Sequence, residues 1–451
     1  MRFLHSMVLL LAGLASLQAM AWGNHSLAAY RAFENMPEVA GAPSVTAESL
    51  DSFLRAEEYT IEALLASQEA WALASTEKFP ARPPELAFKA DAGRSDEMRR
   101  LAFLRALRIA PDSKFTLYSQ SDPWNPGPGT PLPTSAVTPL PEATGATTSA
   151  PTKYMALKPG DLVPALTVLA TATDEPDLGL DANLFEDNPS EWGKSYGFGP
   201  QPYGNPLLVQ ASQAPFHMGF MHEGRLVVLA IPAVKRSLIL LRSHQYSTLA
   251  ALAFRTGHTY WGWRFAGLSL HYLQDLTQPF RAVLAPGESV ARLLSAQVLA
   301  LSGMPGMKND LFQLKANRLL TLEKYQVDLL VRAASSKQEG VLEKALHNMD
   351  KDKVYPEWND RSLRDVVSPQ ACRAAPTLAK ALVAAMPAAL VFDAGSDFAA
   401  RDSAINQAEE LFRHDSPERA RLDATLAELM GNFGAHSRNE LRGILRASDP
   451  L

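Results

Sequence analysis

Several features that commonly reveal a function are missing from this chain. It has one cysteine, Cys372, so no intramolecular disulfide can form. It lacks a Gly-rich phosphate loop, a Walker motif and a G-x-S-x-G element, which excludes the nucleotide-binding and hydrolase classes that depend on them. The apolar run 378–392 is too short to span a membrane and carries Lys380. Strand patterns are scarce, with Leu226–Ile231 the best, so the sequence predicts a mainly α fold.

The composition is that of a folded protein. The 451 residues are 47% apolar and 20% charged, enough for a sizeable core in two modest domains or one large one with insertions. The net charge of −5 gives no overall attraction to nucleic acid or to an anionic membrane, although a local basic groove stays open.

The first residues have the pattern of a secretory signal. Arg2 precedes an apolar run, and Ala19-Met20-Ala21 is a small-x-small cleavage site. We therefore expect residues 1–21 to be removed and the protein to be exported, to the periplasm or outside the cell. Trp22 would then carry a free α-amino group with a pKa near ~8, which with its carbonyl oxygen can chelate a metal. His25 could be the next ligand; the alternative is a surface histidine at a frayed terminus.

Helical spacing covers most of the remaining chain. Two stretches rich in Pro, Gly or Asn, 120–151 and 181–205, are expected to be loops. Helices are predicted within 27–36, 46–79, 95–110, 237–277 (two helices broken near Gly257), 288–302, 308–335 and 337–451, the last closing with an amphipathic segment at 403–447.

The stretch Leu268–Arg281 carries the strongest chemical signal. His271 and Asp275 are four residues apart, so both lie on one helix face, where they form half of a metal site or a base with its orienting acid. The apolar residues around them indicate a buried helix, and Pro279 should end it. The alternative for the pair is a satisfied ion pair in the core.

Two further segments offer ligands. An apolar run from Leu166 ends in the acids Asp174, Glu175 and Asp177, which are either a solvated turn or a source of one carboxylate ligand. His217 and His222 are five apart, too far for one helical face, so at most one of them should reach the same site.

The helix that bears His271 has two other informative features. Gly267 lowers helix propensity, which is understandable where another group must approach closely. The aromatic residues Tyr260, Trp261 and Trp263 favour a place in the core over a substrate platform.

Together these features resemble the superfamily of zinc-dependent phospholipases C and single-strand-specific zinc nucleases. The resemblance rests on a mature N-terminus at Trp22, on His25, and on Leu268–Arg281, which follows that family's L-H-Y-L-G-D-x-x-Q-P-M-H pattern. It covers roughly 22–335, with insertions at about 40–160 and 181–210. It implies an all-helical fold that binds zinc ions and hydrolyses phosphodiesters.

The resemblance also implies ligands. Trp22 and His25 would bind one zinc ion, and Asp275 would bridge it to a second one held by His271, His217 and an acid of the 174–177 cluster, for which Asp177 is preferred. Asp177 would also be the partner of the attacking water.

The departures concern the third zinc ion of that family. A ligand histidine is replaced by Arg281, and a later His/Glu pair falls on Leu322 and Gln326. We therefore expect two zinc ions rather than three, with Arg281 replacing the lost ion as a clamp on phosphate. The alternative is a decayed site in which Arg281 pairs with a surface acid.

The sequence thus predicts a signal peptide (1–21), a helical metal-binding domain (22–335) and a helical C-terminal extension packed on it (336–451). The predicted activity is phospholipase C-like hydrolysis of a phosphodiester, with a phospholipid substrate favoured over nucleic acid and a transient contact with a membrane surface. The alternatives are a single-strand-specific nuclease and a catalytically impaired protein that keeps its metals for structure.

Overall fold

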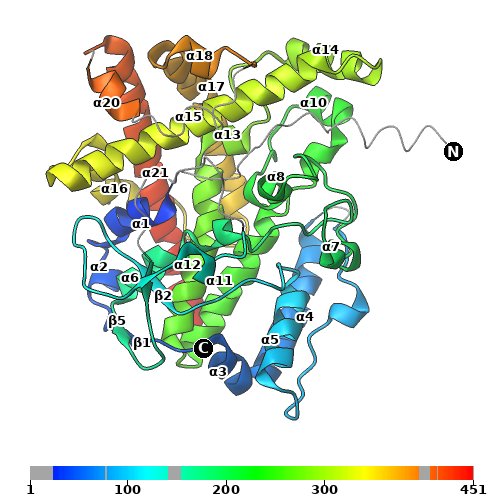
Figure 1. Cartoon of the computed structure of the whole chain (residues 1–451), viewed down its shortest axis with the longest axis vertical. Coiled ribbons are helices and arrows are strands. Elements are labelled where there is room, and N and C mark those ends of the chain that lie inside the picture. Colours follow the sequence, from blue (N-terminus) through cyan, green and yellow to red (C-terminus); the bar gives the residue numbers. More distant parts are fainter. Residues whose placement is uncertain (1–23, 77–78, 141–153, 396–406, 414, 450–451) are drawn as a thin grey trace.

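The computed structural model describes residues 24–76, 79–140, 154–395, 407–413 and 415–449. It is 63% helix and 3% strand, which confirms the mainly α class. Figure 1 shows α11, α12 and α21 together at the centre, with α15 crossing above them. Among the described residues, no helix combines the length and apolarity needed to cross a membrane.

The helical elements follow one another along the whole chain. The α-helices are α1 (His25–Phe33), α2 (Pro37–Ala40), α3 (Leu50–Ala56), α4 (Glu58–Ser75), α5 (Asp96–Leu107), α6 (Ala165–Ala172), α7 (Glu191–Ser195), α8 (Val209–Ser212), α9 (Ala214–His217), α10 (Arg225–Ala230), α11 (Ile239–Arg255), α12 (Thr259–Thr277), α13 (Pro279–Ala282), α14 (Val290–Leu301), α15 (Gly306–Ser336), α16 (Val341–His347), α17 (Ser368–Ala385), α18 (Ala388–Val391), α20 (Gln407–Phe412) and α21 (Pro417–Ser448). The short 3-10 helices are η3 (Pro84–Leu86), η4 (Thr134–Ala136), η5 (Glu175–Leu178), η6 (Pro232–Lys235) and η7 (Asp350–Lys353), and η8 (Leu363–Val367) is a π-helix.

Two small antiparallel sheets lie at the periphery. In the first, β1 (Val45–Thr46) pairs with β5 (Leu162–Val163). In the second, β4 (Tyr154–Ala156) lies between β2 (Tyr118–Gln120) and β3 (Pro131–Leu132). The predicted loop 120–151 therefore contains short elements, and its residues 141–153 lie outside the described part.

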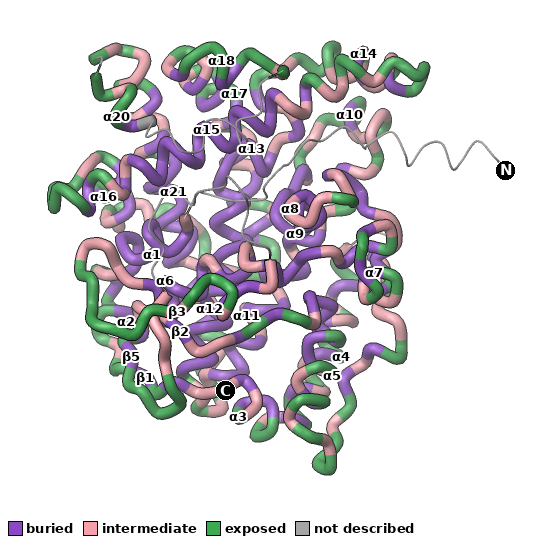
Figure 2. Tube along the Cα trace, viewed as in Figure 1, coloured by how far each residue is buried: buried purple, intermediate pink, exposed green. Residues whose placement is uncertain are grey.

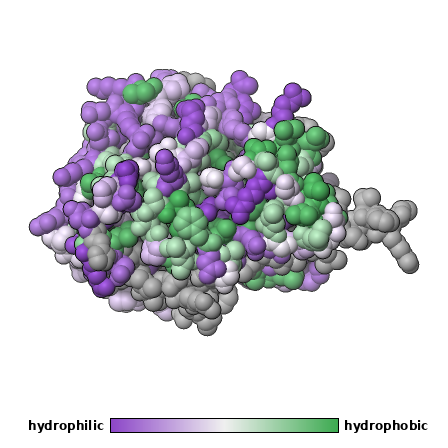
Figure 3. Space-filling view, turned by 90° about the horizontal axis from the view of Figure 1, so that it is seen from above, coloured by the Kyte–Doolittle hydropathy of each residue, from purple (hydrophilic) through white to green (hydrophobic). Residues whose placement is uncertain are grey.

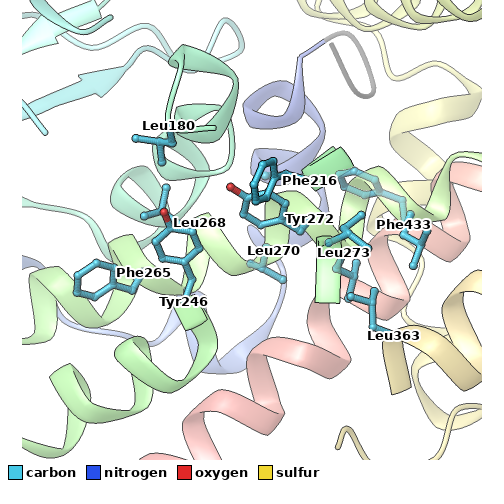
Figure 4. Close-up of a cluster of buried hydrophobic side chains, with 14 of the residues drawn as sticks. Leu180, Phe216, Tyr246, Phe265, Leu268, Leu270, Tyr272, Leu273, Leu363 and Phe433 are labelled. Atoms are coloured by element: carbon cyan, nitrogen blue, oxygen red, sulfur yellow. The ribbon is translucent and has the colours of Figure 1, made fainter. Parts of the chain in front are cut away.

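Helix α12 is the central element. Gly257, with φ +84°, separates it from α11, which confirms the predicted break because this conformation favours glycine. Every residue from Tyr260 to Thr277 is buried, and a helix buried on all sides must lie inside the fold. Figure 4 shows Tyr272 and its neighbours close to Tyr246 of α11, Phe216 of α9 and Phe433 of α21.

The end of α12 sets the direction of the next residues. Gln278 is extended, and its side chain accepts a hydrogen bond from the Phe280 amide (2.5 Å). Pro279 then occupies the first turn of α13, where its missing N–H costs nothing. The predicted turn is confirmed, and it places Arg281 back toward α12.

Helix α6 lies unusually close to α12. A Cβ atom on Gly267 would be 2.5 Å from both the Leu169 carbonyl oxygen and the Ala172 Cβ atom. Glycine is therefore required there, as expected for a close approach. The contact positions η5, which follows α6 and carries Asp177.

The predicted strand at Leu226–Ile231 is wrong: the segment forms helix α10. A short aliphatic run fits either structure by pattern alone. Here Val227 is buried while Leu226 and Leu229 are exposed, which is helical spacing, and no other strand pairs with it.

The C-terminal helices share the core of the preceding residues. Leu426, Phe433 and Leu441 of α21 belong to the same hydrophobic cluster as α12. Arg438 Nη1 donates hydrogen bonds to the carbonyl oxygens of Ala32 (2.9 Å) and Leu346 (2.9 Å). Helix α21 is therefore part of the framework that holds α1 and α12.

Candidate metal centre

Three histidines from separate elements meet beside α12. His25 is the first residue of α1, His217 the last residue of α9, and His271 lies in the middle of α12; all three are fully buried. His271 Nε2 lies 3.0 Å from His217 Nδ1, and the rings of His25 and His271 are 4.3 Å apart between centroids. Local structure explains the position of His25, since the Asn24 side chain caps α1 and makes His25 its first residue.

An oxygen atom faces the outer nitrogen of each imidazole. His271 Nδ1 lies 2.7 Å from the Thr173 carbonyl oxygen, and His25 Nδ1 lies 2.8 Å from Gln274 Oε1. His217 Nε2 faces Asp181 Oδ2 at 3.4 Å. The Thr173 and Gln274 oxygens only accept hydrogen bonds, so the protons of His271 and His25 belong on their outer nitrogens, and Nε2 of each presents a lone pair to one space, as in metal sites. His217 faces a carboxylate oxygen at both nitrogens, with Asp275 Oδ2 2.8 Å from its inner Nδ1, so it can donate a proton at either nitrogen and at both when it is charged.

Two carboxylates border the same space. Asp275 Oδ2 lies 2.8 Å from His217 Nδ1 and 3.4 Å from His271 Nε2, and its Oδ1 lies 3.6 Å from His25 Nε2. Asp177 Oδ1 lies 3.7 Å from His271 Nε2 and 3.8 Å from His217 Nδ1. Two overlapping groups result, His25–Asp177–His271 and His217–His271–Asp275, with ligand atoms within 4.8 Å of one another. Each group could hold a metal ion.

The other two acids of the 174–177 cluster have different partners. Asp174 Oδ1 accepts hydrogen bonds from the amides of His25 (2.7 Å) and Ser26 (3.2 Å), so it anchors the start of α1. Glu175 forms a two-point ion pair with Arg264. Asp177 is the acid whose carboxylate reaches the histidines, and its side chain is 14% exposed.

The buried carboxylates of the cluster favour positive charge beside them. Burial lowers the pKa of His217, but the carboxylates of Asp181 and Asp275 outweigh it and raise that pKa to about 9. The pKa of His25 is likewise raised, chiefly by Asp275 against the effect of burial. The pKa of Asp275 is held well below its ordinary value because Arg281 and the histidines outweigh burial. The carboxylates thus favour added positive charge, which protons or a metal can supply.

Polar atoms of the cluster that lack hydrogen-bond partners also indicate a site for a cation. Within the described part of the chain, no group donates a hydrogen bond to Asp177 Oδ1 or Asp275 Oδ1, and His25 Nε2 has no hydrogen-bond partner either. Leaving such buried groups unpaired costs about 1–3 kcal/mol each, which is large beside a total stability of roughly 5–15 kcal/mol. A divalent cation among these atoms would remove that cost. Imidazole nitrogens and carboxylate oxygens are the donor set that zinc prefers.

Arg281 lies at the edge of the cluster. It is fully buried, its Nε is 3.7 Å from Asp275 Oδ1, and its Nη2 donates a hydrogen bond to Glu323 Oε1 (3.3 Å). Arg281 thus pairs with acids, as the alternative of a decayed site expected, but Asp275 and Glu323 are buried and not at the surface. Arg281 Nε and Nη1 have no hydrogen-bond partner among the residues that the structure describes, so part of the guanidinium can bind another anion.

The side chains near Arg281 on α15 do not form a third metal group. Leu322 is packed in the core. Burial raises the pKa of Glu323 well above its ordinary value, because Arg281 offsets only part of the effect. Both amide atoms of Gln326 are buried without a hydrogen-bond partner. Among the described residues, the metal-type groups contain neither Glu323 nor any other residue of α15.

The remaining candidate residues lie elsewhere. His222 is exposed, and its Nε2 donates a hydrogen bond to the Arg364 carbonyl oxygen (2.8 Å), so one histidine of the pair reaches the cluster, as predicted. Trp22 lies outside the described residues. Tyr260, Trp261 and Trp263 are buried, which confirms their place in the core.

Three residues that contact the cluster were not predicted from the sequence. Asp181 faces His217, accepts hydrogen bonds from Tyr272 Oη (2.7 Å) and Arg242 Nε (2.7 Å), and lies four residues beyond Asp177. Gln274 and Glu323 became visible only through their contacts with His25 and Arg281. Gln274 lies three residues beyond His271, so helical spacing was the one signal that could have indicated it.

In comparisons with known proteins, no family model, curated protein or solved structure matches the chain.

Proposed function

We propose that the protein is a metal-dependent phosphodiesterase of the phospholipase C type, with the fold implied by the zinc phospholipase C and nuclease resemblance. The observation that carries the proposal is the convergence of His25, His217, His271, Asp177 and Asp275 on one buried space. Four separate segments supply them, so the arrangement is not a consequence of local sequence. An ordinary core ion pair between His271 and Asp275 would need none of the other three.

Two zinc ions suit this set of donors. His25, Asp177, His217, His271 and Asp275 would hold them, and Trp22 would add its α-amino group if the chain begins there. Zinc held here would polarise phosphate oxygens and lower the pKa of a water molecule.

The residues of the chain have distinct tasks in this proposal. Asp177 has the partly exposed carboxylate and an oxygen without a hydrogen-bond donor, so it is placed to accept a proton from the attacking water. Asp181 and Gln274 orient His217 and His25. Arg281 offers two unpaired N–H groups to a phosphate oxygen, in the place that a third zinc ion has in the resembled family.

A phospholipid substrate is favoured over single-stranded nucleic acid. Binding of single strands depends on exposed aromatic rings over a basic groove. The aromatic residues of α12 are buried and do not supply such rings. The proposal includes export, with residues 1–21 removed as a signal.

A second candidate is a metal centre that serves stability alone. It is favoured by burial: His25, His217, His271 and Asp275 have no exposed surface, and Asp177 is the one ligand of the five that meets solvent. A structural site is closed in this way, whereas a catalytic site keeps a position open.

Metal analysis combined with turnover separates these candidates. The exported chain is assayed for zinc, and for hydrolysis of bis(p-nitrophenyl) phosphate, phosphatidylcholine and single-stranded DNA, with and without chelator. We expect two zinc ions per chain and chelator-sensitive hydrolysis of the first two substrates. Tightly bound zinc without turnover on any substrate would support the structural centre.

Arg281→Lys tests the phosphate clamp. Lysine keeps the charge but loses the fork, so we expect retained zinc and a phosphodiester turnover lowered by roughly tenfold or more. Three zinc ions in the unaltered chain would contradict replacement of a metal by Arg281. N-terminal sequencing shows whether Trp22 carries the free amine.

A further inference from the structure

An apolar projection stands at the end of the molecule formed by α10, α14 and the turn into α15. Leu229 of α10 is 79% exposed and Leu226 is 61% exposed; Val298 and Leu301 of α14 are each 62% exposed, and Met304 in the turn is 58% exposed. Helices α10 and α14 contact one another, so these side chains form one region. Figure 2 shows the largely exposed trace of α14, and Figure 3 shows apolar residues gathered on the side of the molecule where α14 and α10 lie.

Basic residues outnumber acidic ones in this region. Segments 224–237 and 289–309 contain five basic residues, Arg225, Lys235, Arg236, Arg292 and Lys308, and the acids Glu223, Glu288 and Asp310 directly flank them. Between Arg292 and Lys308 there is no charged residue at all. The chain as a whole has a net charge of −5, so the projection differs from the rest of the surface. Arg225 and Lys235 are exposed, while Arg292 is paired with Glu288.

An apolar groove opens in the same region. It is lined by Ile231 from the α10 side, Leu284 before α14, Leu293 of α14 and Phe312 of α15, with Gln297 and Lys308 at its polar edge. Exposed apolar side chains that gather beside such a groove mark a site of interaction.

We propose that α10 and the α14–α15 turn bind the surface of a lipid bilayer that contains anionic lipids. Exposed aliphatic side chains with an excess of basic over acidic residues beside them are the composition of interfacial helices. The leucines and Met304 would enter the boundary between headgroups and acyl chains, while Arg225 and Lys235 meet lipid phosphates. The uncharged stretch 293–307 is too short to span a bilayer, so we expect these residues to contact the bilayer at its surface.

This inference deepens the proposed function and rests on it for one point, the phospholipid as substrate. The membrane contact itself depends only on α10, α14 and the turn. Binding can therefore be measured with chelator present, when hydrolysis is not required.

The test is sedimentation of the full chain with vesicles of phosphatidylcholine alone or of phosphatidylcholine with phosphatidylglycerol. The variant is Leu229→Asp/Leu301→Asp, which alters exposed side chains only. The control is Leu162→Asp, because Leu162 is 74% exposed in β5, in another part of the fold. Hydrolysis of bis(p-nitrophenyl) phosphate is measured on all three proteins without chelator.

We expect binding to vesicles with phosphatidylglycerol, weaker binding at high salt, and a loss of roughly tenfold for each Leu→Asp change in the variant. The control should bind like the unaltered chain, and the soluble diester should be hydrolysed equally by all three. No binding of the unaltered chain to either vesicle, or undiminished binding of the double variant, would overturn the proposal. A dimer that the double variant abolishes would also overturn it, since a second copy would then cover the projection. Absence of diester hydrolysis alongside normal binding would count against the proposed function alone.

Discussion

At the scale of single residues, His217 and His222 show that residue type alone does not determine whether a histidine belongs to the candidate metal centre. They are five residues apart, yet His217 is fully buried among Asp275, Asp181 and His271, whereas His222 lies exposed against the Arg364 carbonyl group. His217 is the last residue of α9, and the chain leaves the helix at Met218 in an extended conformation. The two residues therefore form a matched pair for testing the metal centre.

His217→Ala should weaken the proposed zinc binding by at least about a hundredfold, since even an outer partner of a ligand is worth roughly 10–100-fold. His222→Ala removes one exposed hydrogen bond and should leave zinc binding unchanged. Zinc titration of the two variants checks this. Equal affinities would remove His217 from the metal centre.

Glu440 of α21 gives a prediction about pH. Its Oε1 accepts hydrogen bonds from Ser269 Oγ (2.5 Å) and Ser243 Oγ (3.4 Å), but its Oε2 has no partner, and burial raises its pKa from 4.5 to about 7. The folded protein thus keeps a proton that the unfolded chain releases, so stability is highest below the unfolded pKa and falls as pH rises to the folded pKa.

Glu440→Gln should remove this loss, because the amide keeps an acceptor for the serines and never ionises. We expect the free energy of unfolding of the variant to exceed that of the unaltered chain by up to roughly 3 kcal/mol at a pH of about 8, and the difference to vanish at a pH of about 4. Urea unfolding at the two pH values measures it. Glu428→Gln, exposed on the same helix, is the control and should not change the pH dependence.

At the scale of elements, the contact between α6 and α12 determines whether the ligands meet. Helix α6 leads into Thr173, whose carbonyl oxygen faces His271, and then into Asp174 and Asp177. The sequence indicated a close approach at Gly267, and the structure identifies α6 as the element that approaches. Any separation of the two helices would move Asp177 away from the histidines.

Gly267→Ala should therefore be destabilising despite the better helix propensity of alanine. The added Cβ would lie 2.5 Å from backbone and side-chain atoms of α6, and overpacking costs about 1–3 kcal/mol or more, against a gain of about 1 kcal/mol from propensity. Gly306→Ala, with open space around its Cβ in α15, should be neutral or slightly stabilising. Urea unfolding compares them, and a stable Gly267→Ala protein with normal zinc affinity would contradict the packing argument.

Helix α10 shows that the hydrophobic pattern of a short segment does not distinguish a helix from a strand. Its six residues contain two valines and two leucines, which suit a strand as well as a helix. The choice depends on a neighbouring strand to share hydrogen bonds, and none pairs with this segment in the described structure.

At the scale of the whole molecule, the C-terminal residues complete the core around the site. Helix α21 packs on α1, α11, α12 and α16. Arg438 is fully buried and joins α1 to α16 through two carbonyl oxygens, and its Nη2 pairs with Asp352 at 2.7 Å. Leu426, Phe433 and Leu441 add apolar surface to the same core.

A chain ending at Asp415 should for this reason fail to fold cooperatively and fail to retain zinc. Loss of α21 would expose buried faces of α1 and α12 and leave the carbonyl groups of Ala32 and Leu346 without the Arg438 donor. A chain ending at Arg446 removes exposed residues for the most part and is the control. Circular dichroism with thermal unfolding and zinc analysis distinguish the two; a shortened chain with normal zinc content would show that α21 is dispensable.

The sequence by itself determined what is local. Periodicity and breakers specify the helices and the stop between α11 and α12 at Gly257, and the four-residue spacing places His271 and Asp275 on one face, because these depend on neighbours along the chain. Tertiary structure alone decided which acid faces the histidines, that Asp181 and Gln274 hold the imidazoles, and that Glu323 pairs with Arg281. Those contacts join residues 36 to 249 positions apart, and they follow from how helices pack, which no short stretch of sequence encodes.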